Sequence, residues 1–241
     1  MKSLKLNNVC IQAGTFKVEN INLTIEENQY FTLMGHTGSG KSMLLKAICG
    51  LMQVQKGTIL IDNKDITHLE PRFRNIGYVP QESGLFPHLN VLNNIIFSLR
   101  IKGFSKKDAS NEISKIVDFL QIEDLLNRSV INLSGGEKQK ISLARALAKK
   151  PSILLLDEPV SALDESTKFE ICEILKKIQK EFNVSTIHVC HNIQEAKQIS
   201  DFIGIMYEGK LIKVGSLEDL INIDDNKEIQ RIMHPEYSVM S

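Results

Sequence analysis

An eight-residue glycine-rich segment ends in a lysine and a serine, a combination suited to holding phosphate. It reads Gly35-His36-Thr37-Gly38-Ser39-Gly40-Lys41-Ser42 and matches the pattern G-x-x-x-x-G-K-[ST] in full. The N–H groups of such a loop surround the β-phosphate of a nucleotide, the lysine reaches the β- and γ-phosphates, and the serine hydroxyl binds Mg²⁺. The alternative is a plain glycine turn between a strand and a helix. We predict that all eight residues bind a nucleotide.

Two adjacent carboxylates close an apolar segment further along the chain. Residues 152–159 read SILLLDEP, and open α/β proteins bind their ligands at the carboxyl ends of the strands. Because neighbouring side chains of an extended chain point to opposite sides, Asp157 and Glu158 should have different roles. We predict that Asp157 binds Mg²⁺ and that Glu158 is the general base for an attacking water. The alternative is a pair of solvated acids at a strand end.

A second glycine-rich helix start lies much later in the chain than the first. Residues 133–140 read LSGGEKQK, and Ser134 and Glu137 have the spacing of a capping box. Capping does not require Gly135 and Gly136, and glycines at a helix N-terminus also let a phosphate approach bare N–H groups. The segment is therefore either an ordinary helix start or a second phosphate-binding element.

The elements that must position these residues follow an α/β pattern. Short apolar segments alternate with helical patterns, which indicates a mostly parallel sheet. We expect strands in 30–35, 152–159 and 184–192. The helix after the glycine loop should bury one face, formed by Met43, Leu44, Ala47, Ile48 and Leu51.

The remaining segments predict two smaller parts. The first 30 residues and residues 57–66 look like short strands of a side sheet, and residues 203–215 look like a hairpin that turns at Glu208–Gly209. Residues from about 88 to 150 are mainly helical by pattern and should form a subdomain.

The composition is that of an ordinary soluble globular protein. The 241 residues are 42% hydrophobic and 24% charged, and 29 basic residues balance 29 acidic ones. This balance gives no long-range attraction for nucleic acid, and no apolar run is long enough for a membrane span. The four cysteines are scattered without a C-x-x-C pair, which favours free thiols over disulfides or a zinc site.

Taken together, these motifs resemble the ATP-binding subunit of ABC transporters over essentially the whole chain. GHTGSGKS is then the Walker A loop, ILLLDEP the Walker B strand and LSGGEKQK the family signature, while VPQ, SALD and HVCHN supply Gln81, Asp164 and His191. The resemblance implies a P-loop NTPase (RecA-like) core with a small N-terminal antiparallel β subdomain and an inserted helical subdomain. We expect one ABC ATPase domain over residues 1–241.

The resemblance also implies an ATPase that uses ATP and Mg²⁺ and works as a head-to-tail dimer, either a homodimer or a paired ATPase subunit. The Walker A loop of one subunit would hold ATP, and Ser134, Gly135 and Gly136 of the other would cap its γ-phosphate. Each chain would therefore carry two half-sites, which explains why it has two glycine-rich helix starts.

Site roles follow from the same resemblance. Gln81 would contact Mg²⁺ or the attacking water, and His191 would contact the γ-phosphate and orient the water with Glu158. Asp164 would lie at the dimer interface; on its own it could be a helix N-cap. The expected catalytic residues are then Lys41, Gln81, Glu158 and His191. The expected metal ligands are Ser42, Gln81 and Asp157.

Among the departures from the family pattern, two bear directly on the site. Family members usually stack adenine on an aromatic residue before the Walker A loop, but that place falls near Gln12–Ala13 here. Phe16 is the nearest aromatic residue and is the candidate adenine contact. Asn192 follows the switch histidine where an aspartate is common, so it cannot supply a carboxylate to His191.

Residues 85–99, LFPHLNVLNNIIFSL, most resemble the importer branch that serves molybdate, sulfate, iron, polyamine or sugar uptake. The resemblance implies a peripheral subunit on the cytoplasmic side of the membrane. Its partners would be membrane-spanning permease subunits and, indirectly, an external substrate-binding protein, with no nucleic acid. An ABC exporter ATPase and a soluble ABC ATPase without membrane partners are the alternatives.

The permease should dock around Gly84–Gly103, where Leu85, Phe86 and Leu89 are expected to be exposed beside Gln81. Many importer subunits of this type carry a further regulatory domain at the C-terminus. This chain reaches Ser241 soon after the ATPase fold should close, so we expect no C-terminal regulatory domain.

Overall fold

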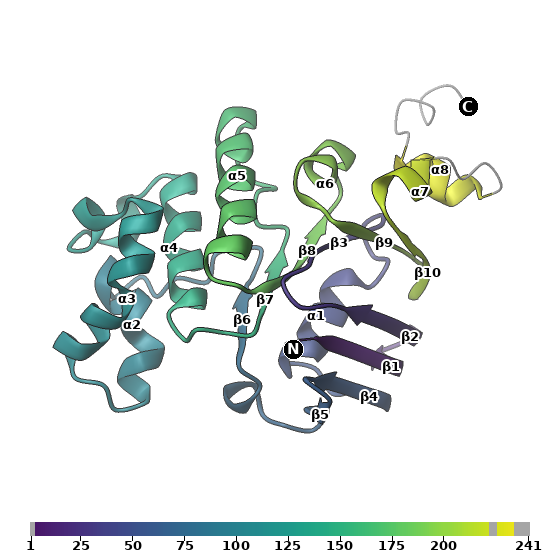
Figure 1. Cartoon of the computed structure of the whole chain (residues 1–241), viewed down its shortest axis with the longest axis horizontal. Helices are drawn as coiled ribbons and strands as arrows, with labels where there is room; N and C mark the ends of the chain where they lie inside the picture. Colours follow the sequence, from purple (N-terminus) through teal and green to yellow (C-terminus); the bar gives the residue numbers. More distant parts are fainter. Residues whose placement is uncertain (1–2, 222–225, 234–241) are drawn as a thin grey trace.

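The computed structural model describes residues 3–221 and 226–233, which form two sheets and the helices around them (Figure 1). The larger sheet has the strand order β10-β9-β3-β8-β7-β6, and the smaller one has the order β2-β1-β4-β5. The strands are β1 Leu4–Ala13, β2 Phe16–Ile25, β3 Tyr30–Met34, β4 Lys56–Ile61, β5 Lys64–Asp65, β6 Ile76–Val79, β7 Ile153–Asp157, β8 Ser185–Cys190, β9 Phe202–Tyr207 and β10 Lys210–Gly215. The helices are α1 Lys41–Cys49, α2 Val91–Ile101, α3 Lys106–Leu120, α4 Gly135–Leu147, α5 Glu165–Glu181, α6 Ile193–Ile199, α7 Leu217–Ile221 and α8 Lys227–Met233.

The larger sheet is parallel except at one edge. Strands β9, β3, β8, β7 and β6 pair in parallel, and β10 pairs antiparallel with β9. Strands β3, β7 and β8 are buried along their whole length, as expected for parallel strands with both faces covered. The predicted mostly parallel sheet and the hairpin at Glu208–Gly209 are confirmed.

Two details of this half of the molecule differ from the sequence analysis. The edge strand β6 was not expected, because it is only four residues long and contains Gly77. Helix α1 ends at Cys49, since Gly50 adopts φ 85°. Leu51 therefore lies beyond the helix and is exposed, so its predicted place on the buried face is wrong.

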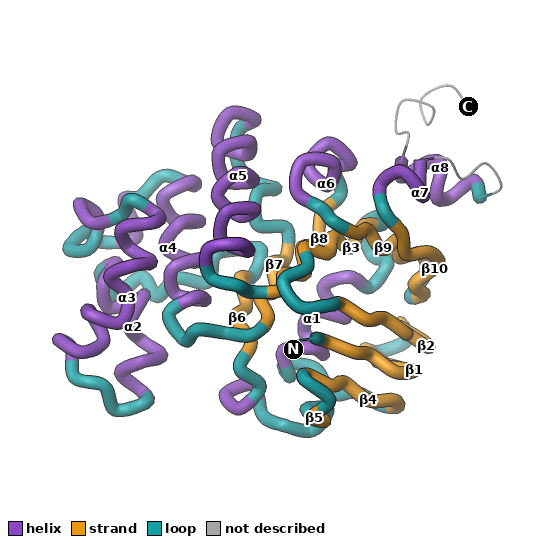
Figure 2. Tube along the Cα trace, viewed as in Figure 1, coloured by secondary structure: helices purple, strands orange, loops and turns teal. Residues whose placement is uncertain are grey.

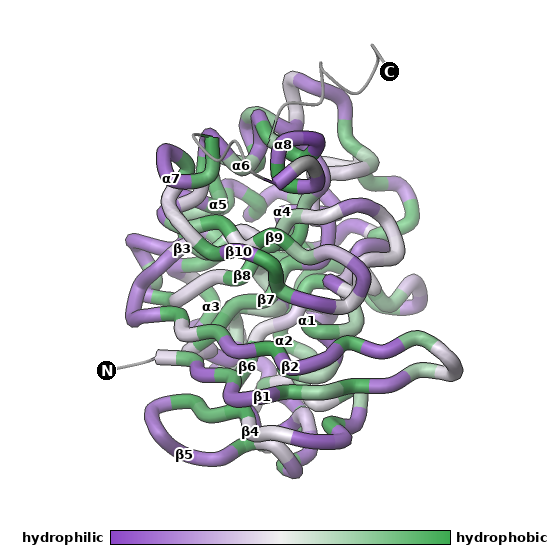
Figure 3. The backbone as a smooth tube through the Cα atoms, turned by 90° about the vertical axis from the view of Figure 1, so that its right-hand side faces the viewer, coloured by the Kyte–Doolittle hydropathy of each residue, from purple (hydrophilic) through white to green (hydrophobic). Residues whose placement is uncertain are grey.

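The smaller sheet is antiparallel and contains both segments that the sequence assigned to a side sheet. Strand β1 pairs with β2 and with β4, in the registers Leu4↔Ile25 and Leu4↔Ile61. Buried and exposed residues alternate along parts of β1 and β2, and hydrophobic and hydrophilic stretches follow one another along both strands in Figure 3. The apolar face packs on α1 and on the larger sheet.

Helices α2, α3 and α4 gather at one end of the molecule, away from the smaller sheet (Figure 2). All three lie within the segment 88–150 that the sequence predicts to be helical. Each begins at a side-chain cap, provided by Asn90, Ser105 and Ser134. Among the residues that the structure describes, no helix is long and apolar enough to span a membrane.

Candidate functional site

The Walker A loop connects β3 to α1 and holds a buried positive charge. Gly40 adopts φ 102°, and a Cβ there would collide with Val18 and crowd the ring of Phe16. Lys41 is only 4% exposed, and its Nζ donates to Gly35 O at 2.8 Å and to His36 O at 3.0 Å. Burial lowers the pKa of Lys41. A buried ammonium group that has only carbonyl partners favours an anion beside it.

Asp157 and Ser42 meet directly beside this loop. Ser42 Oγ donates to Asp157 Oδ1 at 2.7 Å, and the hydroxyl of Tyr78 donates to Asp157 Oδ2 at 3.2 Å. Asp157 is 4% exposed, and burial, followed by the charge of Asp157, raises the pKa of Tyr78. A hydroxyl and a carboxylate oxygen are the hard donors that Mg²⁺ accepts together with nucleotide phosphates, so this pair fits the ion. Tyr78 was missed because it lies in the unpredicted strand β6.

Glu158 points away from Asp157 and contacts the other predicted catalytic side chains. Its Oε1 lies 2.5 Å from His191 Nε2, and its Oε2 accepts from Gln81 Nε2 at 3.0 Å. The second ring nitrogen of His191, Nδ1, lies 2.9 Å from Gly35 O. Glu158 adopts φ 51°, in the left-handed region that a glutamate rarely adopts. The two neighbouring acids therefore have different partners, as the sequence predicts.

The glycine-rich loop and the side chains of Gln81, Glu158 and His191 open into one pocket of about 630 Å³. Its lining comprises part of the Walker A loop, Glu158 with its two contacts Gln81 and His191, and four further side chains. The residues are Phe16, Thr37, Gly38, Gly40, Lys41, Ser42, Met43, Lys46, Met52, Gln81, Glu158 and His191. Phe16 is 37% exposed and stands beside Gly40, where a planar base could stack on its ring. Met43, Lys46 and Met52 carried no chemical motif in the sequence.

The signature segment forms a different pocket, of about 300 Å³. Ser134 Oγ accepts from Glu137 N at 3.2 Å, and Glu137 Oε2 accepts from Ser134 N at 2.7 Å, so the predicted capping box is present. Gly135 and Gly136 have a packing role as well, because a Cβ on either would press on Leu163 or Thr167. No residue lines both this pocket and the Walker A pocket. One chain therefore does not bring its two glycine-rich helix starts together.

Asp164 lines the signature pocket and is the N-cap of α5, one of the two roles that the sequence allowed. It accepts from Ser166 Oγ at 2.6 Å and from Thr167 N at 3.0 Å, and these hydrogen bonds lower its pKa. The segment that leads into α5 therefore lies beside the start of α4, in the same pocket.

A groove of about 290 Å³ lies between β6, α2 and α4. Arg145 donates to Gly84 O at 2.7 Å and to Ser83 O at 3.0 Å, which ties the loop after Gln81 to α4. The rings of Phe86 and Phe97 lie 4.6 Å apart, and both residues line the groove.

The predicted exposure of Leu85, Phe86 and Leu89 is wrong, since all three are half-buried. The buried amide of Asn94 accepts from Phe86 N and donates to the carbonyls of Phe86 and Leu89, which draws this loop onto α2. The exposed apolar side chains of this region are instead Phe97, Ile101 and Phe104.

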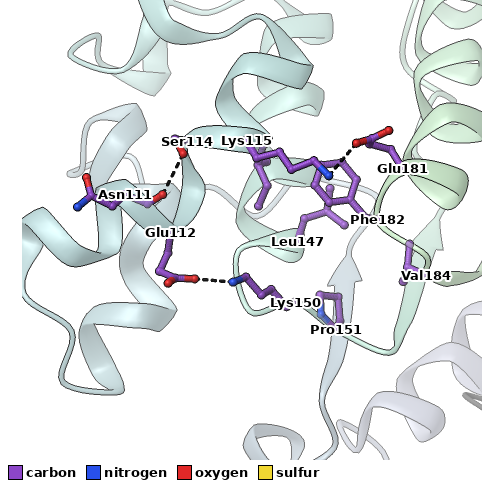
Figure 4. Close-up of a pocket in the computed structure, with 11 residues that line it drawn as sticks. Asn111, Glu112, Ser114, Lys115, Leu147, Lys150, Pro151, Glu181, Phe182 and Val184 are labelled. Carbon is purple, nitrogen blue, oxygen red and sulfur yellow. Dashed lines mark hydrogen bonds and ion pairs between the residues drawn. The ribbon is translucent and has the colours of Figure 1, made fainter.

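A further pocket of about 440 Å³ lies between α3, the end of α4 and the end of α5 (Figure 4). Two ion pairs cross it, Lys115–Glu181 at 2.7 Å and Lys150–Glu112 at 2.6 Å. None of the predicted site residues lines this pocket.

Comparison with known proteins agrees with this arrangement. The family model for the ABC transporter matches residues 18–161. The chain is 37% identical over 230 residues to a molybdate/tungstate import ATP-binding protein of Pyrococcus horikoshii, and this match covers 95% of the chain and 67% of that protein. A protein of the same name from Methanocaldococcus jannaschii is 40% identical, with 95% and 76% covered. A sulfate/thiosulfate import ATP-binding protein of Synechocystis is also 40% identical, with 90% and 62% covered.

Solved structures extend the likeness to the fold. A dimeric ATP-binding cassette in a post-hydrolysis state, bound to ADP and Pi, matches with a TM-score of 0.77 and 31% identity over 88% of this chain and 98% of that chain. A nucleotide-free ATP-binding cassette from an ABC transporter matches with a TM-score of 0.84 and 23% identity, over 96% and 98%, and shares the fold. This chain belongs to the ABC transporter family and is one of its ATPase subunits.

Proposed function

We propose that this chain is the energy-coupling ATPase of an ABC importer and works as a head-to-tail dimer on the cytoplasmic side of a membrane. The import ATP-binding proteins among its relatives support the direction of transport. The main support for the proposed dimer is that the Walker A pocket and the signature pocket are separate within one chain. A second chain, turned head to tail, would place its signature pocket over the first chain's Walker A pocket.

In the proposed complex the Walker A loop, Gly35–Ser42, holds the phosphates of ATP, with Lys41 turned from its carbonyl partners toward them. Phe16 stacks on the adenine. Ser42 and Asp157 would hold Mg²⁺, with Gln81 as a third ligand or as a contact to the water. When bound, the ion neutralises charge on the β- and γ-phosphates.

Glu158 is the general base of the proposed reaction. Its two carboxylate oxygens contact His191 and Gln81, so a shift of either neighbour frees one oxygen to accept a proton from the attacking water. His191 Nδ1 faces the carbonyl of Gly35, which keeps the ring beside the place of the γ-phosphate. Ser134, Gly135 and Gly136 of the second chain cap that phosphate through the hydroxyl, the N–H groups and the helix dipole.

The groove between β6, α2 and α4 is the proposed docking site of the permease subunits. Its lining contains aromatic and basic side chains, and the exposed Phe97 and Ile101 extend its apolar surface along α2. Arg145 connects the groove to the carbonyls of Ser83 and Gly84, two and three residues beyond Gln81. A permease segment in the groove would therefore act on the contact between Gln81 and Glu158.

The test is purification of the tagged chain from detergent-solubilised membranes of the source cell, followed by identification of the chains that co-purify. We expect a stoichiometric multi-span partner, and the substrate-binding protein associated with it would identify the cargo. Phe97→Glu should lose the partner while ATP binding stays unchanged. Recovery from the soluble fraction with cytosolic partners would contradict the importer and leave the ATPase in place.

A further inference from the structure

The switch histidine sits between two buried groups that the proposed reaction does not use. His191 follows β8, and α6 begins at Ile193. Three residues before His191, within β8, lies His188, and four residues after it, in the first turn of α6, lies Glu195. Neither His188 nor Glu195 lines the Walker A pocket.

His188 and Glu195 contact each other across this short segment. His188 Nε2 lies 2.7 Å from Glu195 Oε1, with the imidazole fully buried and the carboxylate side chain 12% exposed. Within the described part of the chain, neither atom makes a hydrogen bond, so this close ion-pair contact is their polar interaction. A carboxylate in such surroundings is costly to leave unpaired, so the contact holds the start of α6 against β8.

Tyr30 determines which way the imidazole of His188 presents its proton. The hydroxyl of Tyr30 lies 2.8 Å from His188 Nδ1, and burial raises the pKa of Tyr30 well above its ordinary value. The phenol therefore stays protonated and can donate a hydrogen bond to Nδ1. In a neutral ring the remaining proton is then on Nε2, facing the carboxylate of Glu195.

The contact closes a short ring of chain that contains His191. Inside this ring Asn192 caps α6 by accepting from Gln194 N at 2.7 Å, and Cys190 Sγ donates to Asn192 O at 3.6 Å. His191 itself is partly exposed, and among the described residues its ring has polar contacts with the carbonyl of Gly35 and the carboxylate of Glu158. Its position thus depends on how firmly both ends of the segment are held.

We propose that His188 and Glu195 are positioning residues for His191, and that the hydroxyl of Tyr30 sets the tautomer through which they act. This inference rests on the proposed role of His191 in hydrolysis. The three groups run from β3 through β8 to α6, and none of them lines the Walker A pocket. A displacement of His191 by about 1 Å would be enough to slow the reaction by about a hundredfold.

The first test replaces the whole contact with apolar groups in the double variant His188→Phe/Glu195→Leu, so that no buried charge is left unpaired. We expect kcat to fall by at least about tenfold while the Kd for ATP changes by less than about twofold. Glu195→Gln keeps an acceptor for Nε2–H and should retain most of the activity. Tyr30→Phe removes one hydroxyl, keeps the fold and should lower kcat less than the double variant does.

Ser200→Ala is the matched control, because Ser200 binds Thr32 in the same polar layer but at the far end of α6. Its kcat should equal that of the wild type. The decisive measurement repeats the double substitution in a His191→Ala background by single-turnover kinetics. We expect no further loss there, since the residue being positioned is gone.

A further loss of the same size in that background would overturn the positioning role. Unchanged kcat in both Tyr30→Phe and the double variant would overturn it too, provided that His191→Ala is slow. If His191→Ala itself hydrolyses ATP at the wild-type rate, the proposed role of His191 is wrong, and this result is distinct from the others.

Discussion

The charged side chain of Lys41 is almost completely buried. The folded-state pKa of this lysine lies below its unfolded value because of burial, so the charged form costs stability at neutral pH. That cost disappears only as the pH rises through the folded-state pKa. A phosphate beside the ammonium group would offset the same cost at constant pH. The loop is therefore less stable empty than filled, which can be measured.

Lys41→Met should raise the thermal midpoint of the nucleotide-free protein and remove the rise that ATP causes. At an ATP concentration of about 100 times Kd, the wild type should gain ~2.7 kcal/mol. For a domain of this size that corresponds to roughly 5–10 °C. Differential scanning fluorimetry measures both effects. Lys46→Met, in the same pocket but outside the loop, should keep most of the ATP-induced rise; an intact rise in Lys41→Met would refute the role given to Lys41.

Glu158→Gln should lower kcat by about 10²–10⁴-fold, because the amide cannot accept the proton of the attacking water. The affinity for ATP should not change. Glu82→Gln, which removes an exposed carboxylate next to Gln81, serves as the control and should hydrolyse ATP normally. Phosphate release measured at saturating ATP distinguishes the two variants. Comparable rates for both would mean that Glu158 is not the base.

At this scale the sequence was informative where chemistry restricts the residue type. The sequence indicated Lys41 because phosphate binding requires a cation in the glycine-rich loop. It indicated Asp157 and Glu158 because Mg²⁺ binding and general-base catalysis require carboxylates at a strand end. Tyr78 could not be predicted, since its contact with Asp157 exists only once β6 pairs with β7. Nor could His188, because a lone histidine in a strand carries no motif.

At the scale of elements, the start of α4 shows how one residue serves two purposes. Ser134 caps the helix through Glu137 N and is also the residue proposed to reach the γ-phosphate of a second subunit. The backbone N–H of Ser134, which donates to the carboxylate, lowers the pKa of Glu137. The stability that this hydrogen bond contributes is therefore complete above the unfolded pKa of ~4.3 and is lost as the pH falls through the folded-state value.

The Glu137→Gln variant should have a lower free energy of unfolding than the wild type at neutral pH, and this difference should shrink as the pH falls. Urea unfolding midpoints at neutral pH should be lower for the variant, and the gap should close below about pH 4. Glu173→Gln, on the exposed side of α5, should show no such closing of the gap. A difference that stays constant with pH would contradict the capping role of the carboxylate.

Strands could be predicted from the sequence where helices cover both faces of the sheet. β3, β7 and β8 were recognisable because parallel strands under helices are apolar throughout. β6 was not, since four residues with a central glycine carry little pattern. The place of Leu51 was misjudged because the apolar spacing continues past Gly50, while the backbone of Gly50 ends the helix.

At the scale of the whole molecule, the two pockets lie apart within one chain, and the proposed dimer would bring them together. The Walker A pocket has the glycine-rich loop with Lys41 and Ser42, together with Glu158, and the signature pocket has a capped helix start beside Asp164. Periodicity and composition cannot indicate this separation, because it depends on how α4 and α1 are placed around the sheet. The family resemblance implied it, and the geometry within one chain agrees with it.

The most direct test of this account is the mass of the Glu158→Gln protein with and without nucleotide, measured by multi-angle light scattering. With ATP and Mg²⁺ we expect twice the monomer mass, and with ADP the monomer. Adding Ser134→Asp should keep the helix cap and ATP binding but place a negative charge against the γ-phosphate, so this double variant should stay monomeric with ATP. A Glu158→Gln protein that binds ATP but remains a monomer, or a dimer that survives Ser134→Asp, would contradict the shared site.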